Sequence, residues 1–250
     1  MSSLLKTQSL TKRYGALLVT DQVSLDIAAG ELHAIIGPNG AGKTTLINQL
    51  SGELASDQGT VFFEGRDVTA HGIHARARQG LLRSYQITSV FDEFTVRENA
   101  TLAAMGAKRH AFRFWQGLLD DKVAVAAADE GIAAAGLQDL ADLPASELAY
   151  GERRQLELAM ALASRPKFLL LDEPMAGMSV QESAKVIDLL QSLKRRYTIL
   201  LVEHDMNAVF SLADRISVLV YGRILMSGTP EEVRGNEEVR SVYLGDEEIH

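Results

Sequence analysis

The sequence feature that most constrains this chain is a glycine-rich segment, GPNGAGKTT, that begins at Gly37. It fits the pattern G-x-x-x-x-G-K-[ST], in which glycines allow backbone N–H groups to turn inward around phosphate oxygens. The segment follows an apolar run at 32–36 and precedes Leu46 and Leu50, which have helical spacing. Because a new helix presents its positive end to such an anion, this order of strand, loop and helix predicts a nucleotide phosphate site.

The residues of this loop differ in what they offer a triphosphate. Lys43 places a positive charge at the β- and γ-phosphates, and the Thr44 hydroxyl can ligate Mg²⁺. A glycine-rich turn without a ligand is the alternative, and the flanking strand and helix argue against it. The predicted nucleotide-binding residues of the loop are Gly37, Pro38, Asn39, Gly40, Ala41, Gly42, Lys43, Thr44 and Thr45.

Three short apolar runs predict the core of the fold. Residues 32–36, 168–171 and 198–202 are too continuously apolar for strands with one face in water, and indicate a parallel sheet buried on both faces. Polar residues or glycine follow each run directly. Ligands of such sheets bind beyond the carboxyl ends of the strands, so we expect the three clusters to contribute to one site.

The segments around this core have other patterns. Residues 3–30 and 59–65 alternate apolar and polar residues, which is typical of antiparallel strands at an edge. Between about 87 and 165 no strand pattern stands out, and the alanine-rich stretch 123–135 is predicted to be helical. The predicted fold class is therefore α/β, a mainly parallel core sheet with an antiparallel β edge and a helical insertion.

Two helix starts can be placed from the sequence. A capping box formed by Ser179 and Glu182 precedes an apolar helical face and predicts a helix over 182–195. Apolar residues spaced by three and four after Gly151 predict a second helix that begins near Glu152.

The composition excludes several classes of protein. The 250 residues are 46% hydrophobic with a formal charge of −8, which indicates a globular chain and is the wrong sign for general adhesion to nucleic acid. The absence of cysteine excludes a disulfide framework, a thiolate metal site and a cysteine nucleophile. There is neither a signal-peptide pattern nor an apolar run long enough for a membrane span. We therefore expect the chain to reach a membrane only through another subunit.

Two carboxylates, Asp172 and Glu173, follow the apolar run at 168–171. Adjacent residues of an extended strand point apart, so one can hold Mg²⁺ while the other addresses a water that attacks the γ-phosphate. The alternative is an acidic strand end that only makes capping hydrogen bonds, and the phosphate loop makes the catalytic interpretation the stronger one.

Together these segments resemble the ATP-binding-cassette (ABC) ATPase family over nearly the whole chain. The loop at Gly37 and the Asp172–Glu173 pair match its Walker A and Walker B motifs. The remaining motifs, in the family's order, are the aromatic Tyr14, a Q-loop Ser84-Tyr85-Gln86, a signature Leu148-Ala149-Tyr150-Gly151-Glu152 and the switch histidine His204. In isolation Tyr14, Gln86 and His204 would be interpreted as a core aromatic, a surface polar residue and a hydrogen-bonded histidine.

The resemblance implies a role for each motif. Tyr14 stacks on adenine, Gln86 links Mg²⁺ and the attacking water to the transmembrane partner, and His204 contacts the γ-phosphate. The implied catalytic residues are Glu173, His204 and Gln86, the implied Mg²⁺ ligands are Thr44, Gln86 and Asp172, and the signature residues placed at the nucleotide are Ala149, Tyr150, Gly151 and Glu152. The implied cofactors are ATP and Mg²⁺.

The resemblance also implies an organisation and a set of partners. Residues 1–250 form one nucleotide-binding domain, with an α/β core at 1–86 and 166–250 and a helical subdomain at 87–165 that carries the signature. The partners are transmembrane permease subunits, a second ATPase subunit or a second copy in a head-to-tail dimer, and indirectly a periplasmic solute-binding protein, with no nucleic acid. The location is the cytoplasmic face of the inner membrane.

The chain departs from the commonest motifs in two places. Ala149 stands where the signature LSGGQ has serine, so a hydroxyl contact to the partner's γ-phosphate is absent and backbone N–H groups remain. Ser179 stands where the D-loop SALD has aspartate, and it is already explained as a helix cap.

With these departures, the segments LAYGERRQLELA, DEPMAGMS, VEHDM and VYLGDEE are similar to those of the ATPases of branched-chain amino-acid importers, and next most similar to those of urea importers. The expected function is ATP hydrolysis that drives uptake of branched-chain or related amino acids. The alternatives are another small polar solute, a soluble ABC ATPase outside transport, or a module that holds ATP without turnover. The mixed basic and aromatic segment 108–115 is expected to be a solvated or partner-facing loop.

Overall fold

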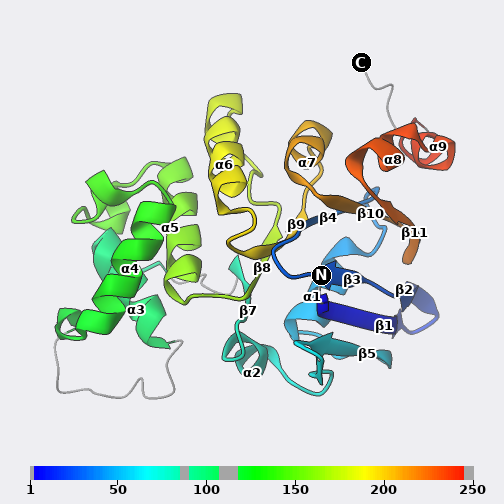
Figure 1. The fold of residues 1–250 in the computed structure, drawn as a ribbon, viewed down its shortest axis with the longest axis horizontal. Coiled ribbons are helices and arrows are strands. Elements are labelled where there is room, and N and C mark those ends of the chain that lie inside the picture. Colours follow the sequence, from blue (N-terminus) through cyan, green and yellow to red (C-terminus); the bar gives the residue numbers. More distant parts are fainter. Residues whose placement is uncertain (1–2, 85–89, 107–117, 245–250) are drawn as a thin grey trace. The chain divides into compact units, whose positions relative to one another are not determined.

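The computed structural model describes residues 3–84, 90–106 and 118–244. The chain forms two compact units, which we call the first unit (residues 1–73 and 194–250) and the second unit (residues 74–193). Their helices and strands are labelled in Figure 1. The phosphate loop belongs to the first unit, whereas Asp172, Glu173 and the signature belong to the second.

A mainly parallel sheet forms the core of the first unit. Strands β4 (Leu32–Ile36) and β9 (Thr198–Val202) are parallel neighbours, and every residue of both is buried. Strand β10 (Arg215–Val220) lies parallel on the other side of β4, and β11 (Arg223–Gly228) pairs with β10 in the antiparallel direction. Burial on both faces explains why the predicted strands at 32–36 and 198–202 show no alternation.

An antiparallel sheet in the first unit confirms the predicted edge. Its order is β2-β1-β5-β6, with β3 also paired to β1. Within it Leu5 and Thr7 are buried while Lys6 between them is exposed, as the alternating sequence requires. The strands are β1 (Ser3–Tyr14), β2 (Leu17–Val23), β3 (Asp26–Ala28), β5 (Gln58–Phe63) and β6 (Arg66–Asp67).

The helices of the first unit begin where local chemistry favours a start. Asp205 accepts hydrogen bonds from the backbone N–H groups of Asn207 and Ala208, and Thr229 forms a capping box with Glu232. These helices are α1 (Lys43–Ser51), α7 (Met206–Leu212), α8 (Pro230–Gly235) and α9 (Glu237–Leu244).

The second unit combines a short parallel strand pair with a group of helices. Strands β7 (Leu81–Arg83) and β8 (Phe168–Asp172) are parallel, and β8 confirms the predicted strand at 168–171. The α-helices are α2 (Ile73–Ala77), which begins at the boundary residue, α3 (Val96–Gly106), α4 (Lys122–Ala134), α5 (Tyr150–Ala163) and α6 (Val180–Leu193). Short 3-10 turns lie at Leu118–Asp120, Gln138–Leu140 and Ala145–Glu147.

Helices α3, α4 and α5 pack together through small residues (Figure 1). Their shared core is rich in alanine, and a Cβ on Gly131 of α4 would lie 2.6 Å from the carbonyl oxygen of Ala159 on α5. The alanine-rich composition that predicted helix at 123–135 therefore also allows the helices to approach closely. The predicted starts of α5 and α6 are confirmed to within two residues.

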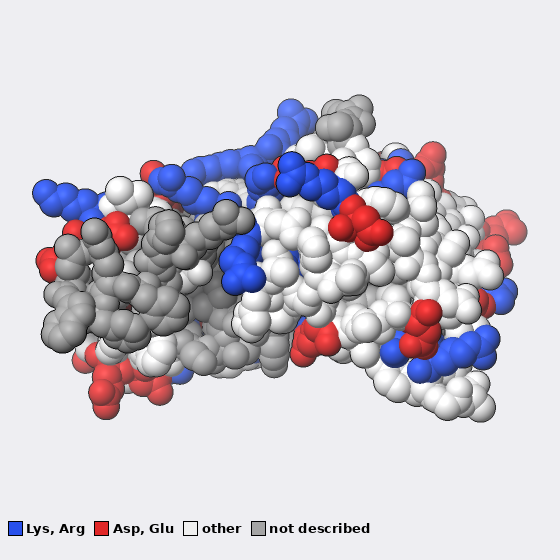
Figure 2. All heavy atoms as spheres, turned by 90° about the horizontal axis from the view of Figure 1, so that it is seen from below, with Lys and Arg blue, Asp and Glu red and all other residues white. Residues whose placement is uncertain are grey.

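The surface carries charges of both signs. On the face drawn in Figure 2, Lys and Arg side chains lie beside Asp and Glu, with uncharged surface between them. In the described ranges, none of the helices has both the length and the apolar character needed to cross a membrane.

Candidate functional site

The phosphate loop runs from the end of β4 to the start of α1. Lys43 begins this helix and folds back over the loop, where its Nζ donates hydrogen bonds to the carbonyl oxygens of Gly37 at 2.6 Å and Pro38 at 3.2 Å. Gly42, the residue that precedes the helix, has no side chain with which to cap the first N–H groups. An anion at this position would be met by backbone donors, the helix end and a lysine charge together.

The glycines of the loop form a cradle that larger residues would fill. A Cβ on Gly37 would lie 2.1 Å from the carbonyl oxygen of Leu219, and one on Gly42 would lie 2.5 Å from that of Val19. Gly40, with a φ of +79°, faces open space. The loop is therefore packed against the protein at both ends and open at its tip, which fits the triphosphate of ATP.

The turn between β10 and β11 supports this loop, and the sequence did not reveal it. The N–H of Gly222 donates to the carbonyl oxygen of Ala41 at 2.9 Å, and the carbonyl of Gly222 accepts from the N–H of Asp21 at 2.8 Å. Arg223 forms an ion pair with Asp21 at 2.5 Å. The signal for this contact is the Tyr-Gly dipeptide at 221–222, which is typical of a turn but does not say what the turn touches.

Tyr14 and His204 also belong to the first unit. Tyr14 ends β1 with half of its surface exposed, and Lys12 Nζ lies 5.8 Å from its ring centroid. Gly37 follows β4 directly and His204 lies two residues after the end of β9, so both residues stand at the carboxyl ends of paired parallel strands. The structure thus brings the loop and His204 to the same edge of one sheet.

A buried carboxylate stands beside His204. Glu203 is 1% exposed, its Oε2 accepts from the backbone N–H of His204 at 3.1 Å, and it lies 3.7 Å from His204 Nδ1. The His204 side chain itself is two-thirds exposed. The exposed imidazole is therefore available to a ligand.

In the second unit Asp172 is the last residue of β8, and Glu173 follows it. Asp172 forms an ion pair with Arg83 of β7 at 2.8 Å, and both side chains are mostly buried. Glu173 is exposed and has a φ of +48°, a left-handed conformation that is unfavourable for a residue with a side chain. Strained backbone of this kind clusters at functional sites. The oxygen donors Thr44 and Asp172 are of the type that Mg²⁺ prefers.

The signature forms the start of α5. Ala149 precedes the helix with extended backbone, and its N–H donates to Glu152 Oε2 at 2.8 Å. The hydroxyl of Tyr150 donates to the carbonyl oxygen of Ala176, in the D-loop, at 3.3 Å. The predicted capping box at Ser179 is confirmed, since its hydroxyl and Glu182 exchange hydrogen bonds. Within the second unit, signature and D-loop are therefore in contact.

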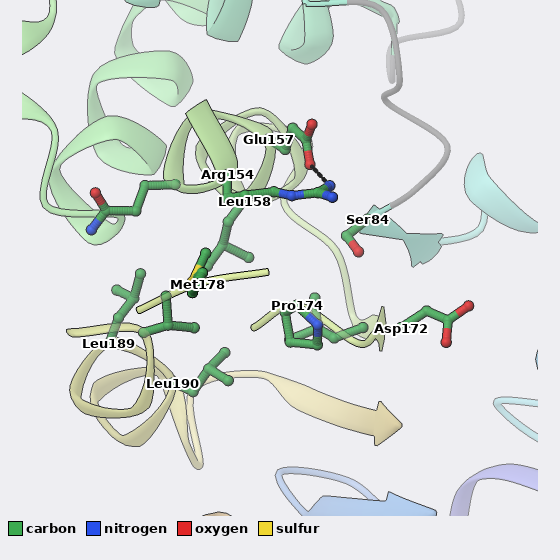
Figure 3. Close-up of a pocket in the computed structure, with 12 residues that line it drawn as sticks. Ser84, Arg154, Glu157, Leu158, Asp172, Pro174, Met178, Leu189 and Leu190 are labelled. Carbon is green, nitrogen blue, oxygen red and sulfur yellow. Dashed lines mark hydrogen bonds and ion pairs between the residues drawn. The ribbon is translucent and has the colours of Figure 1, made fainter. Parts of the chain in front are cut away.

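An apolar pocket of about 40 Å³ lies between α5, α6 and the end of β8 (Figure 3). Leu158, Met178 and Leu190 point into it, whereas the carboxylate of Asp172 points away. Arg154 and Glu157 pair at its rim at 2.8 Å. The pocket is too small for a nucleotide, so it is not the ATP site.

Two sequence predictions fall outside the described residues. Gln86 is one, and the basic and aromatic segment 108–115 is the other.

The segment that leads into α3 is held by buried Asn99. Its side chain accepts a hydrogen bond from the Phe91 N–H at 2.8 Å and donates to the carbonyl oxygens of Phe91 and Phe94. The Phe91 ring is nearly half exposed.

The sequence matches two protein families. Residues 20–176 match the ABC transporter family, and residues 223–249 match the family described as branched-chain amino acid ATP-binding cassette transporter. The high-affinity branched-chain amino acid transport ATP-binding protein LivG of Salmonella typhimurium is 38% identical over 252 residues, which cover 97% of this chain and 98% of LivG. BraF of Pseudomonas aeruginosa, described in the same words, is 36% identical over 97% of this chain and 98% of its own.

A solved structure agrees over the same length. The crystal structure of the ADP conformation of MJ1267, an ATP-binding cassette of an ABC transporter, superposes with a TM-score of 0.86 at 28% identity and covers 98% of this chain and 100% of that one. The predicted family resemblance and the predicted α/β fold class are confirmed by these matches. The chain therefore belongs to the ABC transporter family of ATP-binding cassettes.

Proposed function

We propose that this chain is the ATP-hydrolysing subunit of an ABC importer for branched-chain or related amino acids. The observation that carries the ATPase assignment is the open glycine loop in front of α1, with Lys43 folded over it. The match of residues 223–249 to the branched-chain amino acid cassettes supports the solute class. The solute itself does not contact an ATPase subunit, so the assignment of the solute class depends on sequence similarity to these relatives.

The residues of the first unit bind the nucleotide. Residues Gly37 to Thr45 hold the phosphates through backbone N–H groups and the Lys43 charge, and Tyr14 offers its exposed ring to the adenine. His204 contacts the γ-phosphate with its exposed imidazole.

The residues of the second unit complete the chemistry. Glu173 accepts the proton of the attacking water, while Asp172 and Gln86, with Thr44 of the first unit, are the proposed ligands for Mg²⁺. Mg²⁺ supplies charge neutralisation at the β- and γ-phosphates when it is bound.

The competent site is shared between two chains. Residues Ala149 to Glu152 lie at a helix start, and in a head-to-tail dimer they face the γ-phosphate held by the opposite chain. The opposite chain is a second copy or a related ATPase subunit. The domain division into a core at 1–86 and 166–250 and a helical subdomain at 87–165 belongs to the same proposal.

The partners in the membrane are permease subunits, and the chain lies at the cytoplasmic face of the inner membrane. The segment after Gln86 forms the docking surface, where Asn99 holds Phe91 with its ring exposed. A periplasmic solute-binding protein acts through the permease.

The proposal is tested by reconstitution with permease subunits, a second ATPase subunit and a solute-binding protein from the same organism. We expect ATP hydrolysis that rises when leucine-loaded binding protein is added, and that is lost with Glu173→Gln. A Phe91→Ser variant separates hydrolysis from transport, because it should hydrolyse ATP without solute stimulation.

Other outcomes identify the alternatives. Stimulation by urea and not by leucine would assign the second solute class. Hydrolysis that no permease changes would indicate a soluble ABC ATPase, and ATP binding without phosphate release would indicate a module that does not turn over.

A further inference from the structure

Glu182 joins the starts of two helices in the second unit. Its Oε2 accepts hydrogen bonds from the backbone N–H of Ser179 at 2.9 Å and from the Ser179 hydroxyl at 2.7 Å, which caps α6. Its Oε1 lies 2.9 Å from the position that a Cβ on residue 151 would take. One carboxylate therefore caps α6 and lies against Gly151 in the first turn of α5.

The sequence of the signature explains why a distant residue has this place. The first N–H groups of a helix need acceptors from outside the helix. Ala149, which precedes α5, carries no hydroxyl and cannot supply one. The Ser179 donors hold the pKa of Glu182 below its usual range, so the carboxylate is ionised at neutral pH.

We propose that Glu182 is a further residue of the shared nucleotide site, and that it sets how tightly two chains close around ATP. Its carboxylate lies against Gly151, at the place that the γ-phosphate of the opposite chain has to approach. Closure therefore requires the carboxylate to move away from Gly151, while its hydrogen bonds to Ser179 can remain. This inference rests on the shared site proposed above.

The sign of the effect follows from charge. A phosphate and a carboxylate are both negative, so they repel each other at close range. Glu182 therefore favours the open state and weakens ATP-driven closure. Nucleotide binding to one chain uses the phosphate loop of the first unit and should not change.

The test compares variants in a Glu173→Gln background, which retains ATP and accumulates closed pairs. Glu182→Gln removes the charge but keeps a side chain that can cap α6, since glutamine serves in the same capping box. Glu182→Asp keeps the charge and shortens the reach to Gly151. Asp188→Asn, at an exposed position of α6, is the matched control for the loss of one charge.

Light scattering with increasing ATP measures closure, for the full chain alone and mixed with its partner ATPase subunit. We expect Glu182→Gln to lower the ATP concentration for half-maximal closure about tenfold, Glu182→Asp to lower it less, and Asp188→Asn to leave it unchanged. The ATP affinity of the single chain, measured by calorimetry with a monomeric sample, should be equal in all variants.

The two proposals fail differently. If Glu173→Gln alone never closes with ATP, the shared site is wrong and this inference falls with it. If Glu173→Gln closes but Glu182→Gln closes equally well or less well, the shared site stands and the role of Glu182 is overturned. If Glu182→Gln does not fold, the Glu182→Asp variant decides: the role of Glu182 is overturned if this variant closes at the same ATP concentration as Glu173→Gln alone.

Discussion

At the scale of single residues, Lys43 is the most sensitive position of the phosphate loop. Its charge is held over the loop by the Gly37 and Pro38 carbonyls. We expect Lys43→Ala to weaken ATP binding at least a hundredfold, roughly 2.8 kcal/mol, because the triphosphate charge is then uncompensated. Calorimetry on the purified chain measures this loss. Lys6→Ala, at an exposed position of β1, is the control and should bind ATP normally.

Gly222 is a second sensitive position, although it is far from the loop in sequence. It has a φ of +77°, and a Cβ there would lie 2.4 Å from the carbonyl oxygen of Val19. We expect Gly222→Ala to displace the turn that supports Ala41, and so to weaken both ATP binding and the fold. Gly15→Ala has a matched φ of +58° with nothing within 4 Å.

Comparing Gly222→Ala with Gly15→Ala separates backbone strain from a clash with neighbouring atoms. Gly15→Ala should lose only the cost of placing alanine in a left-handed conformation, about 1–2 kcal/mol of unfolding free energy, with ATP affinity unchanged. Equal ATP affinities for the two alanine variants would contradict a role of the turn in holding the loop.

At the scale of secondary-structure elements, a buried polar network joins β4, β10 and β11. His33 is 1% exposed, its Nδ1 lies 2.7 Å from Glu31 Oε1, and its Nε2 lies 2.8 Å from Ser217 Oγ. Ser217 in turn contacts Ser227 of β11. Each ring nitrogen therefore has a hydrogen-bonding partner, which is what a buried histidine needs.

Removing one member of this network should destabilise the sheet. Ser217→Ala leaves His33 Nε2 without its partner, and we expect a loss of about 1–3 kcal/mol in the free energy of unfolding. Urea denaturation measures it. Ser211→Ala, on the exposed surface of α7, should change stability by less than about 0.5 kcal/mol. A neutral Ser217→Ala would show that the network adds nothing to the fold.

At the scale of the whole molecule, the decisive property is assembly. With ATP we expect Glu173→Gln to form a closed pair, because this variant keeps the phosphate loop and lacks the carboxylate proposed as the general base. Gly151→Asp should prevent closure, since its carboxylate would meet both Glu182 in its own chain and the partner's phosphate. Sizing by light scattering with and without ATP distinguishes the two. A Glu173→Gln chain that stays monomeric with its partner subunit present would contradict the shared site.

Much of this architecture could be predicted from the sequence. The strands β4, β8 and β9 are continuous apolar runs, so the sequence predicts them directly. The phosphate loop is equally predictable because its glycine and lysine pattern is specific for binding phosphate. The capping box at Ser179 can also be predicted, because its two residues are only three positions apart. These features are encoded by residues close together in the chain.

The contacts between distant segments could not be predicted. The support of Ala41 by Gly222, the pairing of Arg83 with Asp172 and the reach of Glu182 to Gly151 depend on tertiary placement. Ser179 and Glu182 predicted a helix start correctly, yet the same carboxylate also contacts a second helix. The capping box predicts the role of Glu182 at the start of α6, but it does not predict that Glu182 also lies against α5.

The left-handed backbone of Glu173 has a consequence for protein engineering. Glycine at this position would relieve about 1–2 kcal/mol of strain, whereas glutamate supplies the carboxylate that we propose as the general base. A screen that selects heat-resistant variants of this chain without selecting for turnover would therefore enrich Glu173→Gly, and would deliver a sturdier protein that no longer hydrolyses ATP.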